Sequence, residues 1–79
     1  MAGLPERNKI ILKSVLEGET LGNVGSKYGI TIERTRQIVF KLCRIARRKL
    51  EVHFSGEEWQ ASLQFFRENK TFIYAALEI

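Results

Sequence analysis

Apolar residues in this chain recur at intervals of three and four, the spacing that places side chains on one face of an α-helix. The first such segment, residues 6–18, follows Pro5, the only proline. Proline is favoured in the first turn of a helix, and Gly18 is well suited to follow the last turn. The spacing predicts a first helix whose buried face carries Ile11, Leu12, Val15 and Leu16.

Two further helices are predicted on either side of Gly29. Thr20 is a good N-cap for residues 21–28, and Thr31 is one for residues 32–50. Glycine at position 29 suits the left-handed backbone conformation in which many helices end. The apolar positions expected to face the core are Leu21, Val24, Tyr28, Ile38, Val39, Leu42, Ile45, Ala46 and Leu50.

The last third of the chain differs in composition. Ser55 and Glu58 form a capping-box pattern, which predicts a helix over residues 57–68. Its apolar face carries Trp59, Leu63 and Phe66. Thr71 is expected to cap a final short helix, and residues 51–55 are either a loop or a bent continuation of the third helix. The whole chain is therefore predicted to be all-α, with four or five helices.

The net charge of +4 is unevenly distributed along the 79 residues. Residues 1–50 contain 11 Lys and Arg against 4 Glu, whereas residues 51–79 contain 2 against 5. A basic segment is typical of proteins that bind nucleic acids, and a solvated basic helix face is an equal alternative. Without a membrane-length apolar run, a signal peptide or a second cysteine beside Cys43, we expect one soluble cytoplasmic domain with no membrane partner.

The segment around Gly29 has the pattern of a helix-turn-helix, in which two helices cross steeply through a tight turn. Such a crossing needs a small residue where the helices nearly touch, and Gly25 stands at that position. Thr35 is a mismatch, because a larger aliphatic residue is more usual in its slot. The apolar anchors are Val24, Tyr28, Ile38 and Ile30, the last expected to be buried in the turn.

The start of the third helix carries side chains that can read bases if it enters the major groove. Arginine can bond guanine in two places, glutamine can bond adenine likewise, and glutamate can accept from cytosine. Other basic residues and the amides that open the second helix can hold phosphates. A salt-bridged helix start without a DNA role is the alternative. The candidate DNA-binding residues are Thr20, Leu21, Thr31, Ile32, Glu33, Arg34, Arg36, Gln37, Lys41 and Arg44.

Residues 4–50 resemble region 4 of the sigma-70 class of bacterial RNA polymerase sigma factors. The resemblance is carried by the opening LPER, the TL before the second helix, the V-G pair and the T-x-E-R-x-R-Q-I run from Thr31. It implies binding to the promoter −35 element, with Glu33 and Gln37 at bases and Arg34 and Arg36 at bases or phosphates. It also implies docking on the flap of the polymerase β subunit.

Two features depart from that resemblance. Ile32 stands where the family commonly has a base-reading arginine, and isoleucine can touch a thymine methyl group but cannot donate to guanine. The acidic, aromatic end of the chain has no counterpart. We expect residues 1–51 to form the helix-turn-helix domain and residues 52–79 to form a helical extension packed on it. The chain is either an excised domain or a small stand-alone regulator of the phage or accessory type.

The apolar residues of the extension have two interpretations. Trp59, Leu63 and Phe66 are most simply core residues, and the alternative is a surface that binds a partner protein or a second copy of the chain. Cys43 is expected to be a small buried hydrophobe, and the lone His53 does not make a metal site. No nucleophile–base pair or phosphate loop is present, so we expect neither an enzyme nor a cofactor.

Three functions are compatible with these residues. The favoured one is a transcription initiation or regulation factor that binds −35-like DNA and docks on RNA polymerase. The second is an accessory protein that binds the β flap or a sigma factor, as a co-activator or anti-sigma factor, with weak or no DNA binding. The third is a dimeric repressor whose interface is the extension.

Overall fold

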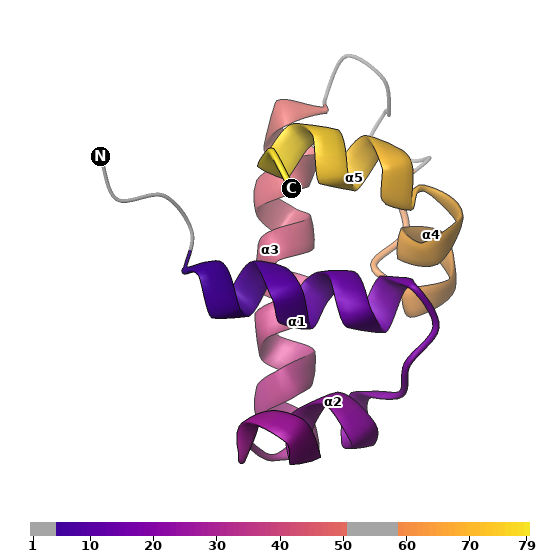
Figure 1. The fold of residues 1–79 in the computed structure, drawn as a ribbon. Coiled ribbons are helices and arrows are strands. Elements are labelled where there is room, and N and C mark those ends of the chain that lie inside the picture. Colours follow the sequence, from indigo (N-terminus) through magenta and orange to yellow (C-terminus); the bar gives the residue numbers. More distant parts are fainter. Residues whose placement is uncertain (1–4, 51–58) are drawn as a thin grey trace.

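In the computed structural model, residues 5–50 and 59–79 are described, and all of their regular secondary structure is helical. α3 is the longest helix; α1 and α5 cross it in opposite directions, and α2 lies at its N-terminal end (Figure 1). None of the helices described has both the length and the apolar character that a membrane crossing requires. The all-α prediction is confirmed, with the helices α1 (Glu6–Leu16), α2 (Leu21–Tyr28), α3 (Ile32–Lys49), α4 (Leu63–Glu68) and α5 (Lys70–Leu77).

Threonine side chains fix the starts of α2 and α3, as predicted. The Thr20 hydroxyl accepts a hydrogen bond from the backbone N–H of Asn23 at 3.1 Å, and the Thr31 hydroxyl accepts one from the N–H of Arg34 at 3.0 Å. Between them, Gly29 ends α2 in the left-handed conformation, with φ 67° and ψ 30°. These caps satisfy backbone donors that a helix end leaves unpaired and set the turn between the two helices.

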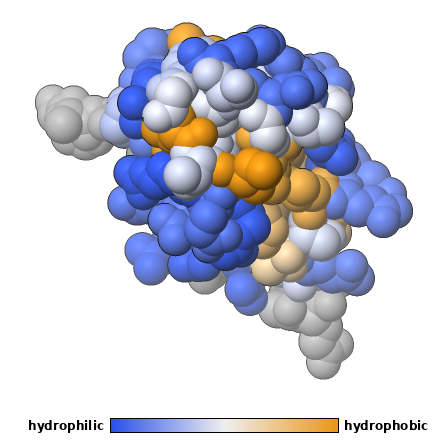
Figure 2. Space-filling model, turned by 90° about the horizontal axis from the view of Figure 1, so that it is seen from below, coloured by the Kyte–Doolittle hydropathy of each residue, from blue (hydrophilic) through white to orange (hydrophobic). Residues whose placement is uncertain are grey.

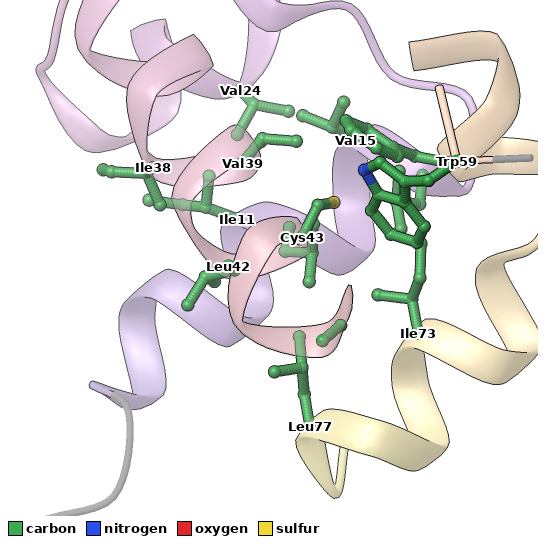
Figure 3. Packing of buried hydrophobic residues seen from close by; sticks show 14 residues of the cluster. Ile11, Val15, Val24, Ile38, Val39, Leu42, Cys43, Trp59, Ile73 and Leu77 are labelled. Atoms are coloured by element: carbon green, nitrogen blue, oxygen red, sulfur yellow. The ribbon is translucent and has the colours of Figure 1, made fainter. Parts of the chain in front are cut away.

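A single hydrophobic core joins the first three helices to the C-terminal extension, by which we mean residues 59–79 of the part described. Trp59 and Ile73 point into the same space as Val15 of α1 and Cys43 of α3 (Figure 3). Burying this apolar surface is the main favourable term for a chain of this size. The buried residues of this core cluster are Ile11, Leu12, Val15, Leu16, Val24, Ile38, Val39, Leu42, Cys43, Ala46, Trp59, Phe66, Ile73 and Leu77.

Polar contacts fasten the extension to the end of α1. The Arg67 guanidinium donates to the carbonyl oxygens of Val15 at 3.1 Å and Glu19 at 3.2 Å, which satisfies acceptors near the C-terminus of that helix. The Glu17 carboxylate accepts from the Lys70 ammonium and from the Tyr74 hydroxyl, each at 2.9 Å. These two donors, Lys70 first, hold the pKa of Glu17 below its ordinary value.

The start of the fourth helix differs from the prediction. α4 begins at Leu63, and Ser62 caps it by accepting from the N–H of Phe65 at 3.1 Å. A continuous helix would separate Trp59 and Phe66 by about 10 Å along its axis. Their rings instead lie 5.8 Å apart, because the non-helical residues 59–62 allow the indole to fold back over α4.

Thr71 does not cap the last helix, and this prediction was wrong. α5 begins at Lys70, directly after Asn69, whose side-chain amide donates to the carbonyl of Phe65 at 2.9 Å. Asn69 therefore joins α4 to α5 and places Thr71 inside the first turn. The predicted capping box of Ser55 and Glu58, the boundary between residues 51 and 52, and His53 lie outside the described residues.

Candidate nucleic-acid interface

The first two turns of α3 have one buried side and one exposed side. Thr35, Ile38 and Val39 are buried against α1 and α2. On the opposite side, Ile32, Glu33, Arg34, Arg36 and Gln37 are exposed. The end of the molecule where α2 and α3 meet is mainly hydrophilic, with hydrophobic atoms near the middle of that face (Figure 2). The structure therefore brings the predicted base-reading side chains together on one outward surface.

The crossing of α2 and α3 depends on Gly25. A Cβ at this position would lie 2.7 Å from the Thr35 hydroxyl and 2.8 Å from the carbonyl oxygen of Ile30. The Thr35 hydroxyl itself donates to the carbonyl of Thr31 at 2.8 Å. The sequence mismatch at Thr35 is thus a fully buried, hydrogen-bonded side chain that fits against the bare glycine backbone. Ile30 is half-buried in the turn, less than predicted.

Glu33, Arg36 and Gln37 form a connected polar group on the exposed side of α3. The Arg36 guanidinium donates from Nε to Glu33 Oε1 at 3.0 Å and from Nη2 to Glu33 Oε2 at 2.6 Å. The Gln37 amide donates to Glu33 Oε2 at 3.5 Å. The salt bridge holds the pKa of Glu33 below and the pKa of Arg36 above their ordinary values. Both groups are therefore charged at neutral pH, and their salt bridge favours one orientation of the Arg36 guanidinium.

Ile32 is the most exposed large apolar residue described, with 61% of its surface accessible. It lies at the first position of α3, and its side chain is within ordinary contact distance of the position that a Cβ on Gly22 would take. An exposed aliphatic group can meet a methyl group but cannot hydrogen-bond. The exposure of Ile32 leaves the contact with a thymine methyl group, which the sequence analysis allowed for isoleucine, as a prediction.

Two predicted phosphate-binding residues lie at the same hollow. Arg34 and Lys41 of α3 line a cavity of about 110 Å³ together with Pro5 and Asn8 at the start of α1. The Asn8 side-chain oxygen is buried there and has no hydrogen-bond partner in the part of the chain described. Asn8 was missed by the sequence analysis, because nothing in its local pattern shows that α1 begins beside α3.

The remaining DNA-binding candidates lie apart from that hollow. Arg44 is exposed three residues beyond Lys41 on α3. Thr20 is exposed at the start of α2, where its hydroxyl already caps the helix, and Leu21 is half-buried beside it. Thr31 is exposed at the start of α3 and has the same capping role. Thr20, Leu21 and Thr31 thus lie at helix starts, whereas Arg44 lies further along α3.

The residues considered for partner binding lie mostly inside the molecule. Phe66 is 1% exposed and Trp59 is 8% exposed, and both belong to the core, while Leu63 is half-buried against it. The core interpretation therefore holds for Trp59 and Phe66, because their rings fill space between α3, α4 and α5. They do not form an open surface for a partner or a second copy.

Catalytic or metal chemistry finds no support among the residues described. No group of three or more His, Cys, Asp or Glu side chains is placed to hold a metal ion there. Cys43 is buried as predicted, and this burial raises the pKa of its thiol to about 12. A thiol with that pKa is a poor nucleophile at neutral pH, because the thiolate is the reactive form.

A family model described as Sigma-70, region 4 matches residues 1–50 of the chain. This match contains α1, α2 and α3, and so it contains every DNA-binding candidate named above. No curated protein and no solved structure matches the chain.

Proposed function

The chain belongs to the sigma-70 region 4 family of non-catalytic, DNA-binding transcription domains, and we propose that it binds promoter −35-like DNA by placing α3 in the major groove. Transcription from such promoters takes place in the cytoplasm of a bacterium or of a phage-infected bacterial cell. The observation that carries the proposal is the exposed row of Glu33, Arg36 and Gln37 on the first two turns of α3. This is the part of a recognition helix that meets base edges.

In this proposal, each of four exposed side chains of α3 suits a particular base. Glu33 is a carboxylate at neutral pH, so it accepts hydrogen bonds and suits the amino group of cytosine. Gln37 can both donate to and accept from adenine, and Ile32 can touch a thymine methyl group. Arg36 can donate to guanine while Glu33 holds one edge of its guanidinium. The four side chains together favour a mixed sequence rather than a single repeated base.

Phosphate contacts orient α3 in the groove. Arg34 and Lys41 hold one phosphate at the hollow beside Asn8, and Arg44 reaches a phosphate further along α3. The start of α2, with exposed Thr20 and half-buried Leu21, faces another phosphate through backbone amides. Contacts of this kind raise affinity for every duplex and carry no sequence information by themselves.

The proposal is tested by NMR titration of the isotope-labelled protein with a −35-like duplex and with a scrambled duplex at the same salt concentration. We expect shifts concentrated between Thr31 and Lys41, larger for the −35-like duplex. Glu33→Ala and Gln37→Ala are each expected to reduce discrimination by about 1–3 kcal/mol, whereas Arg44→Ala weakens both duplexes alike. Equal shifts with both duplexes would refute sequence-specific reading.

Docking on RNA polymerase is a second candidate function, favoured by the exposure of Ile32. An aliphatic side chain in place of a base-reading arginine weakens DNA recognition, and a protein contact then contributes more to promoter binding. A pull-down with the isolated β flap tests this candidate. Retention that survives Arg36→Ala with Gln37→Ala supports docking independent of DNA. Failure to retain the flap or any other polymerase subunit removes it.

A further inference from the structure

Four side chains link the C-terminal extension to the base-reading surface in an unbroken row. The Phe66 and Phe40 rings meet edge to face with centroids 5.2 Å apart. The Arg36 guanidinium carbon lies 5.4 Å from the centroid of the Phe40 ring, and Glu33 holds the same guanidinium by two hydrogen bonds. We infer that Phe40 is a positioning residue for Arg36 and that the extension, through Phe66, contributes to sequence reading without touching DNA.

The row begins in a buried, densely packed part of the molecule. Phe66 is 1% exposed, and its ring lies 5.8 Å from the indole of Trp59 and 6.4 Å from the ring of Phe65. Trp59 and Phe65 also meet edge to face at 5.1 Å. Aromatic rings in these arrangements attract one another beyond their buried area. Phe66 therefore presents a fixed surface to α3.

Phe40 connects the buried Phe66 ring to the exposed Arg36 side chain. It lies one helical turn after Arg36, the spacing at which side chains on α3 are neighbours. Phe40 is half-buried, and it packs against Phe66 while also contacting the Arg36 guanidinium. A cation over an aromatic ring is attracted by the charge distribution of the ring. Because Phe66 limits the motion of the Phe40 ring, that ring in turn limits the motion of the Arg36 guanidinium.

The contacts with Glu33 leave N–H donors of the Arg36 guanidinium available to a base. A guanidinium has five N–H donors, and Glu33 takes one on Nε and one on Nη2. One donor on Nη2 and both on Nη1 remain, which is enough to bond guanine in two places. Arg36 can thus keep Glu33 and Phe40 as supports while it reads. Preorganised donors lose less conformational freedom on binding than mobile ones.

This inference rests on the proposed function, and its first readout needs no DNA. In the free protein, Phe40→Leu is expected to shift the Arg36 Nε–Hε resonance toward that of unrestrained arginines and to lower its order parameter. Phe66→Leu is expected to act in the same direction to a smaller extent. Phe40→Tyr keeps the ring and should preserve both observables. Phe72→Leu, the same chemical change at a half-exposed residue of α5, is the control.

The second readout is the affinity ratio between a −35-like duplex and the same duplex with its guanines replaced. Phe40→Leu is expected to reduce this ratio by about five-fold or more, with affinity for the guanine-replaced duplex unchanged. A folded Phe40→Leu protein with an unchanged Arg36 resonance and an unchanged ratio would overturn the inference. If Arg36 responds but wild type discriminates no duplex, the proposed function fails and the positioning by Phe40 stands.

Discussion

Gly25 and Thr35 meet across the α2–α3 turn with no space for a side chain on the glycine. An added Cβ would lie 2.7 Å from the Thr35 hydroxyl and 2.8 Å from the carbonyl oxygen of Ile30. The hydroxyl is held by its bond to Thr31, and the carbonyl is part of the backbone, so neither can move freely. The angle at which α2 and α3 cross therefore depends on the absence of a side chain at Gly25.

Gly25→Ala is expected to destabilise the protein by about 1–3 kcal/mol, the usual cost of overpacking. Gly22→Ala is the matched control on the same helix, because its Cβ would meet only Ile32, at 3.6 Å. Alanine is a better helix former than glycine, so this control is expected to be neutral or stabilising by up to about 1 kcal/mol. Urea unfolding of both variants gives the comparison, and similar midpoints would contradict the close approach.

Arg34 and Lys41 are expected to act on one phosphate, because they line the same hollow. Each alanine variant should weaken binding to −35-like and scrambled duplexes equally and reduce the salt slope by about 1. The double variant should depart from additivity by more than about 0.5 kcal/mol. Lys49→Ala, at the exposed far end of α3, is the control. Strict additivity of Arg34→Ala and Lys41→Ala would assign them to separate phosphates.

The docking of α5 is expected to weaken in acid through Glu17. Its pKa is lowered in the folded protein by hydrogen bonds from Lys70 and Tyr74, so its contribution is full above its ordinary value of 4.5. That contribution is lost as the pH falls below 4.5 and through the lowered pKa, where the carboxylate takes up a proton. Glu17→Gln should therefore be less stable than wild type near neutral pH, with a smaller difference in acid.

Urea midpoints measured at neutral pH and well below pH 4.5 test this dependence on Glu17. Tyr74→Phe removes one donor and leaves Lys70 in place, so it should show part of the same effect. A difference between wild type and Glu17→Gln that stays constant over this pH range would exclude the carboxylate as its source.

Cys43 is expected to be nearly inert toward alkylating reagents in the native protein. Its side chain is fully buried between α1, α3 and the extension, and burial raises the pKa of the thiol to about 12. Reaction with iodoacetamide should therefore proceed only through unfolding and accelerate steeply as urea is added. Fast alkylation in the absence of urea, at the rate of the unfolded chain, would show that the core opens locally around α3.

Local sequence patterns predicted the first three helices well. Thr20, Thr31 and Gly29 act within one turn of their own positions, so their effect does not depend on distant residues. The exposed side of α3 was predictable for the same reason, since helical periodicity separates Glu33 and Arg36 from the buried positions. The chemistry of the base-reading candidates could thus be inferred before the fold was known.

The C-terminal extension was predicted less accurately, because its local and tertiary preferences conflict. Helical spacing aligned Trp59 with Phe66, yet the indole folds back on α4 through a non-helical segment. α5 begins directly after Asn69 and not after Thr71, because the Asn69 side-chain amide donates to the Phe65 carbonyl. In each case a contact formed by packing overrides a plausible local signal.

The sequence by itself determined that the chain is helical, that a glycine turn joins its second and third helices, and which side chains face outward from α3. These properties follow from backbone preferences and a period of 3.6 residues. Only the tertiary structure decided that Phe40 lies between Phe66 and Arg36, and that Asn8 lies beside Arg34 and Lys41. Contacts between residues far apart in the chain depend on how helices cross, and periodicity carries no information about that crossing.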